Sequence, residues 1–201
     1  MFVLGVCGGS GSGKGAVCAL FSEIGIPSID TDALYHEMTA GKNALTDALS
    51  ARFGNEILDG EGALIRSRLA EIVFRPGAQE ALADLNRISH YHILSEVRVW
   101  LKKMEAKGYA AAIVDAPLLF ESGFDKECDG VLCVYAPLEL RIARIMKRDS
   151  IPRERAVRRI EAQVSDEYLL ARSGYHIYNA GDISELRARV LEIAEKIRSE
   201  V

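Results

Sequence analysis

The sequence has no long apolar stretch and no excess of positive charge. Its first apolar run, residues 2–7, is interrupted at Gly8, which is too early for a signal peptide or a membrane span. Lys and Arg number 25 against 29 Asp and Glu, a formal net charge of −4. A general basic field, which attracts nucleic acids and anionic membranes, is therefore missing. We expect a protein that binds neither of them, with any positive patch confined to a local site.

Cysteine is scarce, and its spacing indicates neither a redox motif nor a metal site. The cysteines lie in largely apolar runs and form no CxxC pair, so buried thiols in a reducing compartment are favoured over disulfides. This predicts a cytoplasmic protein. His90 and His92 lack further ligands nearby in the sequence, which favours a structural or substrate-contact role over metal binding. The four cysteines are Cys7, Cys18, Cys128 and Cys133.

Short apolar runs alternate with helical patterns along much of the chain. Each run is nearly continuous, as expected for a strand covered on both faces of a parallel sheet. With 201 residues and 49% hydrophobic content, the chain can bury one sizeable core. We therefore predict an α/β fold with a five-stranded parallel sheet flanked by helices. The five runs are residues 2–7, 26–29, 109–114, 131–136 and 175–178.

Two segments break this alternation. Residues 35–107 contain helical stretches and no convincing strand, which predicts a helical insertion. Residues 138–163 are helical by composition and dense in arginine, and Pro152 marks a turn or a helix start there. The α/β core is then assigned to residues 1–34, 108–137 and 164–201. The helical stretches expected in the insertion are residues 45–53, 66–74, 79–85 and 88–107.

The sequence GGSGSGK at residues 8–14 has the GxxxxGK pattern of a phosphate-binding loop. Glycines let backbone N–H groups turn inward around a phosphate, the following helix offers its positive end, and Lys14 reaches the β- and γ-phosphates. The motif follows a predicted strand and precedes a predicted helix, which favours nucleotide binding over a merely flexible loop. The expected nucleotide contacts are Gly9, Ser10, Gly11, Ser12, Gly13, Lys14, Gly15 and Ala16.

Gly15 departs from the usual pattern of such loops. Serine or threonine normally stands here and supplies a hydroxyl ligand to magnesium, and Ala16 cannot supply one either. We therefore expect no direct protein ligand to Mg²⁺. Asp32 and Asp115 are the candidates to hold magnesium through water.

Carboxylates follow two of the predicted strands. Asp30 and Asp32 come directly after the second run, where residues of a parallel sheet line the ligand crevice. A kinase that phosphorylates a hydroxyl can use a carboxylate to take its proton, and Asp32 is the candidate base. Its alternative role is a helix N-cap. For Asp115, after the third run, orientation of a magnesium-bound water and capping of a turn are equally open.

The arginine-rich segment places Arg141, Arg144 and Arg148 at i, i+3 and i+7. On a helix they form one basic stripe able to grip a triphosphate. A solvated helix face is the alternative, because charge runs usually are solvated faces.

Taken together, these motifs resemble the dephospho-coenzyme A kinase family in order and over nearly the full length. The match includes GGSGSGKG at residues 8–15 and IDTD at residues 29–32. It continues through Phe53-Gly54 with Ile57-Leu58, LNRISH at residues 85–90, DAPLLFESG at residues 115–123, RIMKRD at residues 144–149, and Arg159-Ile160 with Ala162-Gln163.

The resemblance implies an activity and a set of site residues. The activity is ATP-dependent phosphorylation of the ribose 3′-hydroxyl of dephospho-coenzyme A, the last step of coenzyme A synthesis. Residues 35–107 would bind the acceptor and residues 138–163 would form a lid. The implied catalytic residues are Lys14, Asp32, Arg144 and Arg148; Asn179 aligns near the adenine site, and Asp32, Arg66, His90, Pro117 and Leu118 match acceptor positions.

Several positions depart from the family pattern, and two alternatives stay open. Another nucleoside or nucleotide kinase would share the loop and the lid, and Gly15 leaves room for a noncatalytic nucleotide-binding protein. A GTPase is disfavoured because no NKxD-type guanine signature is found. The sequence leaves the oligomeric state open, with a monomer plausible. The departures are Gly15 and Ala16 for hydroxyl residues, Ile65 for an acidic residue, Tyr91 for proline and Arg141 for glutamine.

Overall fold

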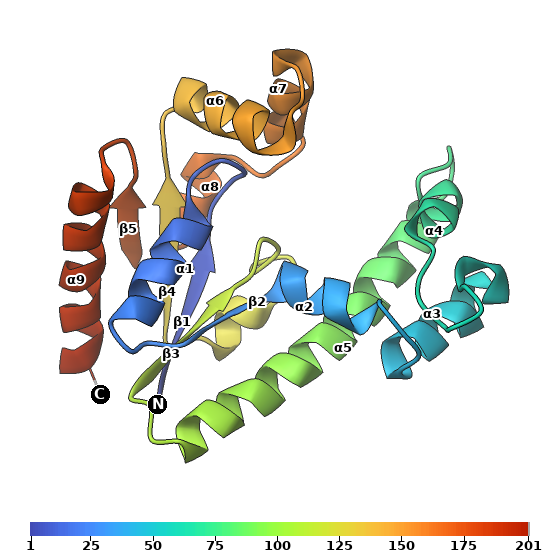
Figure 1. Ribbon diagram of the computed structural model, residues 1–201, viewed down its shortest axis with the longest axis horizontal. Coiled ribbons are helices and arrows are strands. Elements are labelled where there is room, and N and C mark those ends of the chain that lie inside the picture. Colours follow the sequence, from blue (N-terminus) through green and yellow to red (C-terminus); the bar gives the residue numbers. More distant parts are fainter. Residues whose placement is uncertain (201) are drawn as a thin grey trace. The chain divides into compact units, whose positions relative to one another are not determined.

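The protein contains one five-stranded, all-parallel sheet (Figure 1). The computed structural model describes residues 1–200. The five predicted strands are confirmed, and their order in the sheet is β2-β3-β1-β4-β5. The second strand was predicted at residues 26–29 and begins only after Pro27, which has no N–H to donate to a ladder. The strands are β1 (Phe2–Cys7), β2 (Ser28–Asp30), β3 (Ala111–Asp115), β4 (Gly130–Tyr135) and β5 (Tyr175–Tyr178).

The main core lies between the sheet and two helices, α1 (Lys14–Glu23) and α9 (Ile183–Ser199). Alternate residues of β1 enter this core, while Gly5 faces the other side of the sheet. A Cβ at Gly5 would lie 2.9 Å from atoms of both Leu119 and Cys128, so a side chain there would collide with the opposite layer. Gly25, at a φ of 84°, ends α1 in a backbone conformation that favours glycine.

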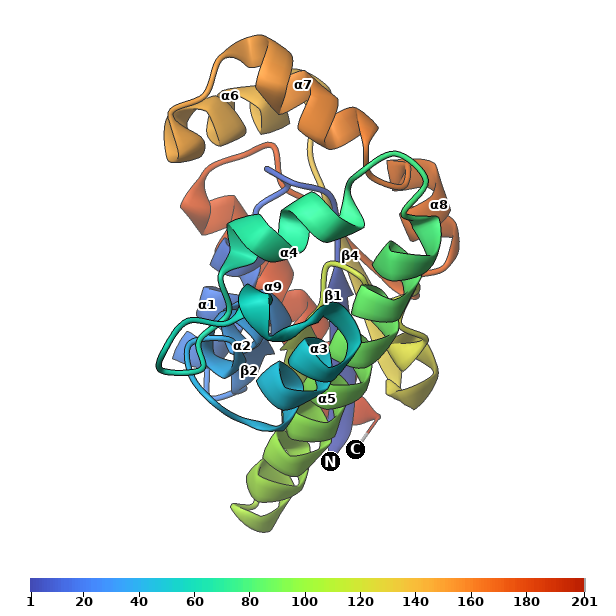
Figure 2. The ribbon, with the colours of Figure 1, turned by 90° about the vertical axis from the view of Figure 1, so that its right-hand side faces the viewer.

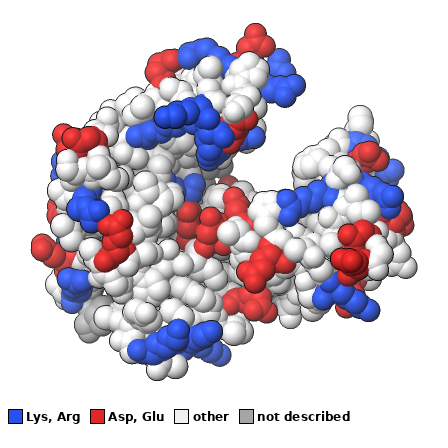
Figure 3. Space-filling view, viewed as in Figure 1, with Lys and Arg blue, Asp and Glu red and all other residues white. Residues whose placement is uncertain are grey.

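Three helices lie between β4 and β5 in the chain: α6 (Leu138–Asp149), α7 (Arg153–Glu161) and α8 (Asp166–Ala171). The first two form a hairpin that both ribbon views show as adjacent helices (Figures 1 and 2). This hairpin has a small apolar core of its own, centred on Ile142, Ile145 and Ala156. Lys and Arg side chains gather over it, with some acidic residues among them (Figure 3). One short 3₁₀ helix, η2 (Phe124–Glu127), precedes β4.

The chain divides into two compact units, Thr31–Trp100 and the remainder of the described chain. The first of these contains no strand within its residues, as the insertion was predicted to do, and it has its own core of Leu and Phe side chains from α3 and Val and Leu from α4. Its elements are α2 (Thr31–Met38), α3 (Ala44–Phe53), the 3₁₀ helix η1 (Asn55–Ile57), α4 (Arg66–Val73) and most of α5 (Gln79–Ala106).

Helix α5 corrects one expectation from the sequence. Two helical stretches were predicted, at residues 79–85 and 88–107, but a single helix of 28 residues spans both. Asn86 and Arg87, which separated the predicted stretches, are neither Gly nor Pro, and such polar residues continue a helix at little cost. No described helix, within residues 1–200, is both long enough and apolar enough to cross a membrane.

Candidate active site

The glycine-rich loop connects β1 to α1, and two of its glycines are required by their surroundings. Gly11 has a φ of 78°, and a Cβ there would lie 2.6 Å from the backbone oxygen of Arg141. Gly13 has a φ of 100°, and a Cβ there would lie 2.1 Å from Nδ2 of Asn179. Positive φ and close contact both exclude larger residues. The glycine pattern therefore reflects a loop that is packed against its neighbours, which is not expected of a merely flexible loop.

The loop presents the groups that a chain of phosphates needs. Lys14 is the first residue of α1, and its Nζ donates a hydrogen bond to the Gly8 carbonyl at 3.0 Å. The Ser12 hydroxyl is buried and has no hydrogen-bond partner among the described residues. A cation at the positive end of a helix, next to a loop with a buried hydroxyl that has no partner among the described residues, fits an anionic ligand.

At Gly15 the structure leaves open space. A Cβ there would meet no atom within 4 Å, and Gly15 and Ala16 are both exposed in the first turn of α1. Within residues 1–200, no three His, Cys, Asp or Glu side chains gather as a protein-built metal site would require. The residues present fit magnesium only as an ion that keeps most of its waters, which is its usual habit at phosphate sites.

Asn179 and Arg144 donate hydrogen bonds to the backbone of the phosphate loop. Asn179 is buried after β5, and its Nδ2 donates to the Ser12 carbonyl at 2.7 Å. Arg144, on α6, donates from Nη1 to the carbonyls of Gly11 and Ser12, each at 3.2 Å, and from Nη2 to the Asn179 carbonyl at 3.2 Å. The structure thus brings two predicted site residues together at the predicted phosphate loop.

The three arginines of the predicted stripe lie in three different environments, which corrects the idea of one solvated face. Arg141 is buried, with 5% of its surface exposed. Arg144 is half-buried against the loop. Arg148 is exposed and forms an ion pair with Asp149 at 2.7 Å, which lowers the pKa of that carboxyl. Asp149 also pairs with Arg159 of α7. Only Arg148 therefore matches the solvated interpretation.

Asp115 ends β3 and is buried beside α1. The Cys18 thiol lies 3.8 Å from its Oδ2 and donates to it. Burial, followed by the negative charge of Asp115, raises the pKa of Cys18, so this thiol stays protonated as a donor. Asp115 is also paired in register with Asp30 of β2, so two carboxylates share this edge of the sheet.

The loop after β3 contains Pro117 and Leu118. Leu118 is 47% exposed, whereas Leu119 beside it is fully buried. Farther along, the Phe120 ring contacts Arg172, the residue after α8, whose guanidinium lies 4.9 Å from the ring centroid and 5.2 Å from that of Tyr168. Cation–π contacts of this kind are worth about 0.5–1 kcal/mol at exposed sites. The loop therefore exposes the apolar side chain of Leu118, while Leu119 and Phe120, which follow it, are packed against the protein.

The remaining predicted residues belong to the unit Thr31–Trp100. Helix α2 begins at Thr31, which places Asp32 inside its first turn and not at the N-cap, so that alternative is wrong. Arg66 begins α4, and its Nη2 donates to the Thr39 hydroxyl at 3.4 Å. Burial raises the pKa of Tyr35, and the charge of nearby Arg66 opposes that shift. His90 is half-buried in α5.

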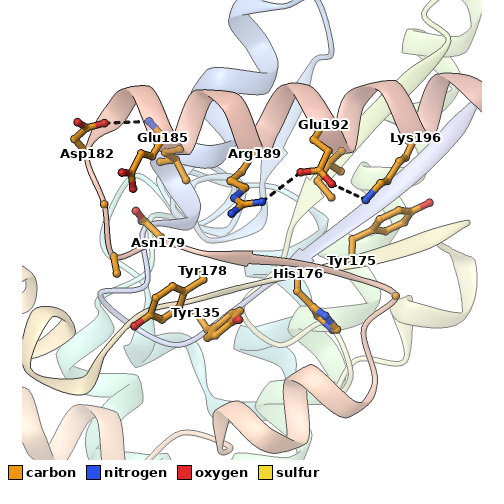
Figure 4. A pocket seen from close by; sticks show the side chains of 15 residues that line it. Tyr135, Tyr175, His176, Tyr178, Asn179, Asp182, Glu185, Arg189, Glu192 and Lys196 are labelled. Atoms are coloured by element: carbon orange, nitrogen blue, oxygen red, sulfur yellow. Dashed lines mark hydrogen bonds and ion pairs between the residues drawn. The ribbon is translucent and has the colours of Figure 1, made fainter.

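A groove of about 670 Å³ lies between β5 and α9, with Asn179 in its wall (Figure 4). The rings of Tyr135 and Tyr178 lie together there, with centroids 5.1 Å apart. On the α9 side, Glu192 accepts from Lys196 at 2.9 Å and from Arg189 at 3.5 Å (Figure 4). The groove therefore offers aromatic surface next to the phosphate loop.

Sequence reasoning missed one residue that contacts the loop and one that contacts the loop through Arg141. The Ser10 N–H donates to Oε1 of Gln163 at 2.8 Å. Asp166, at the start of α8, forms an ion pair with Arg141 at 2.9 Å. Gln163 had been noted only as part of the family resemblance, and nothing in the local pattern around Asp166 distinguishes it from an ordinary first-turn acidic residue.

The strand order and the loop between β1 and α1 define the class of protein, a P-loop kinase. A shikimate kinase from Acinetobacter baumannii shares this fold at 17% identity, with a TM-score of 0.58 over 100% of this chain and 94% of that one. A dephospho-CoA kinase from Campylobacter jejuni reaches a TM-score of 0.72 at 26% identity, over 99% and 98% of the two chains.

The comparisons of sequence identify the family. The family model described as dephospho-CoA kinase matches residues 2–185. A dephospho-CoA kinase from Corynebacterium diphtheriae is 34% identical over 201 residues, which is 100% of both chains. The chain belongs to the dephospho-CoA kinase family, the phosphotransferases of the final step of coenzyme A biosynthesis. Neither alternative that the sequence left open is favoured by these matches.

Proposed function

We propose that the protein transfers the γ-phosphate of ATP to the ribose 3′-hydroxyl of dephospho-coenzyme A, giving coenzyme A and ADP in the cytoplasm. The observation that carries this proposal is the phosphate loop. Arg144 and Asn179 donate hydrogen bonds to its carbonyls, and Lys14 follows it as the first residue of α1. Family membership supplies the acceptor.

In the proposed complex the loop residues 9–16 surround the phosphates. Lys14 exchanges the Gly8 carbonyl for β- and γ-phosphate oxygens, which are stronger acceptors because they are charged. The adenine ring of ATP lies near Asn179, where the groove between β5 and α9 begins. Magnesium, when bound, neutralises charge on the phosphates. Asp115 and Asp32 are the side chains proposed to hold its waters.

The acceptor is proposed to react through Asp32. Its carboxylate takes the proton from the 3′-hydroxyl while that oxygen bonds to the γ-phosphorus and the bond to the β–γ bridging oxygen breaks. Arg144 and Arg148 stabilise the charge that spreads over the transferring group. Arg148 must leave Asp149 to do so, which gives the segment 138–163 the role of a lid that changes between states.

The acceptor itself is proposed to rest on the insertion, residues 35–107. Arg66 and His90 lie in this part of the chain, and the exposed Leu118 with Pro117 adds an apolar contact from the loop after β3. An arginine suits the phosphate groups of a nucleotide-derived acceptor because its planar fork bonds two oxygens at once.

A coupled assay of ADP formation with a panel of acceptors tests the function. We expect transfer to dephospho-coenzyme A and little to AMP, to nucleosides or to shikimate. A Lys14→Met preparation made in parallel is the control for contaminating kinases. Faster transfer to a nucleoside or nucleotide would contradict the acceptor. ATP binding without transfer to any acceptor would favour a noncatalytic binding protein.

A further inference from the structure

One residue of the phosphate loop, Ser10, has both of its backbone polar groups bonded by side chains from outside the loop. Its carbonyl accepts from Nε of Arg141 at 2.9 Å, and its N–H donates to Oε1 of Gln163 at 2.8 Å. Ser10 lies at the middle of the turn, three residues after β1 and four before α1. These two side chains therefore help to fix its position from outside the loop.

The contacts of Arg141 are with the loop and with Asp166. The side chain is buried, and its Nη1 lies 2.9 Å from both carboxylate oxygens of Asp166. Its Nη2 would lie 2.0 Å from a Cβ at Gly9, so the guanidinium packs directly on the backbone of that glycine. All of these contacts lie within one compact unit.

The charge of Arg141 is thus neutralised by Asp166 inside the protein. A buried ion pair contributes little net stability compared with apolar residues of similar size, because desolvation offsets the attraction. What the pair does is anchor one end of the guanidinium: both Asp166 oxygens accept from Nη1, while Nε of the same group donates to the Ser10 carbonyl. Arg141 is not free to reach phosphates as the predicted stripe required.

We propose that Arg141, oriented by Asp166, is a positioning residue for ATP. Through the Nε–H bond to the Ser10 carbonyl, it holds the loop in a shape that accepts phosphates before the nucleotide arrives. The proposal rests on the assignment of this loop as the ATP site. It attributes the effect to one hydrogen bond and not to the positive charge.

Two uncharged substitutions separate these causes. In Arg141→Gln, the amide Nε2 stands at the same number of bonds from the backbone as the arginine Nε, so the bond to Ser10 is retained. Arg141→Met has a similar length and no donor. Both leave Asp166 without its cation to the same extent, so their effects on folding should match. Thermal melts establish the temperature at which both are folded.

We expect Arg141→Met to weaken ATP binding about tenfold, the typical effect of one hydrogen bond with a charged partner. Arg141→Gln should stay within about threefold of the natural protein, and Arg141→Lys, which keeps the charge but has no donor at that position, should resemble Arg141→Met. Asp166→Asn should give a smaller loss. The KM for dephospho-coenzyme A should be unaffected in all four.

The matched control is Arg153→Gln. Arg153 forms an exposed bidentate pair with Glu139 on the same hairpin, at 2.6 and 2.7 Å, and touches no loop residue in this pairing. ATP binding should be unchanged in it. Calorimetric titration with ATP makes the test independent of turnover. Loss of the activity proposed above therefore leaves this test intact.

Two results would overturn the proposal. One is equal ATP binding by Arg141→Met and Arg141→Gln. The other is retention of binding in Arg141→Lys together with loss in Arg141→Gln, which would assign the effect to charge. A natural protein that binds ATP but transfers nothing would contradict the proposed function alone.

Discussion

The phosphate loop and the unit Thr31–Trp100 hold their site residues in opposite ways. Around the loop, Arg141 and Asn179 are buried and donate hydrogen bonds to loop carbonyls. In the helical unit, Asp32 and Arg66 stand exposed on the first turns of helices, and the printed contact of Arg66 is a long one of 3.4 Å. We therefore expect the proposed nucleotide site to be largely formed before its ligand binds, whereas the exposed side chains proposed for the acceptor can change conformation when it binds.

The largest effect is expected on the acceptor side, from Asp32→Asn. Turnover should fall by roughly 10²–10⁴-fold, the usual contribution of a general base. ATP affinity should stay unchanged because the asparagine lies outside the loop. Steady-state rates at saturating substrates and calorimetry with ATP measure the two quantities. Near-normal turnover would remove the base assignment, and a lowered melting temperature alone would indicate only a helix-end role.

Alanine variants of Arg144 and Arg148 test whether these two arginines have different roles, as their different contacts indicate. Arg144→Ala should lower turnover by about 10²-fold, because a preorganised donor to the transferring group is lost. ATP binding should weaken as well, since Arg144 bonds two loop carbonyls. Arg148→Ala should reduce turnover while ATP affinity is kept, because Arg148 is paired with Asp149. Equal effects of both variants on ATP affinity would contradict this difference, and unchanged turnover in both would remove the lid assignment.

Two glycines test how rigid the loop is. Gly13→Ala should weaken ATP binding by about tenfold, because a strained backbone conformation costs on the order of 1–3 kcal/mol and the new methyl meets Asn179. Gly15→Ala is the control, since a Cβ there meets no atom within 4 Å. Titration of both purified variants with ATP gives the comparison. Equal ATP affinities of the two variants would show that the loop changes conformation at little cost.

The smallest effect is expected from Gly15→Ser. A hydroxyl here would occupy one corner of the magnesium octahedron that water otherwise fills. We expect the magnesium concentration for half-maximal rate to fall severalfold, with little change in the maximal rate. Magnesium titrations at fixed ATP compare the two proteins. Superimposable curves would show that Gly15 costs the metal nothing, and recovery of activity only in Gly15→Ser would favour a noncatalytic natural protein.

The sequence predicted the parts of the fold that depend on local pattern. Five continuous apolar runs became five strands, and the GxxxxGK motif lies between β1 and α1. The pattern failed at α5, where polar Asn86 and Arg87 were interpreted as a break between two helices, although neither residue ends a helix. Helix α2 begins at Thr31, two residues before the start that an N-cap at Asp32 implies, so Asp32 lies in its first turn.

The site was predictable in its motifs and not in its supporting contacts. Spacing placed three arginines on one helix, but it could not show that Arg141 is buried against Ser10 and paired with Asp166, 25 residues farther along the chain. Such partners are set by how α6 and α8 pack, and neither helix carries a local signal for it. Residues that bind ligands through a motif can be read from sequence, whereas residues that hold the motif in place require the fold.

The most direct measurement is the identity of the product formed by the natural protein from ATP, magnesium and dephospho-coenzyme A. Mass spectrometry and ³¹P NMR distinguish a new monoester on the ribose 3′-oxygen from one at another position. We expect coenzyme A with its phosphate at the 3′-oxygen, formed together with an equal amount of ADP. A phosphate at another position, or nucleotide binding with no phosphorylated product, would contradict the account.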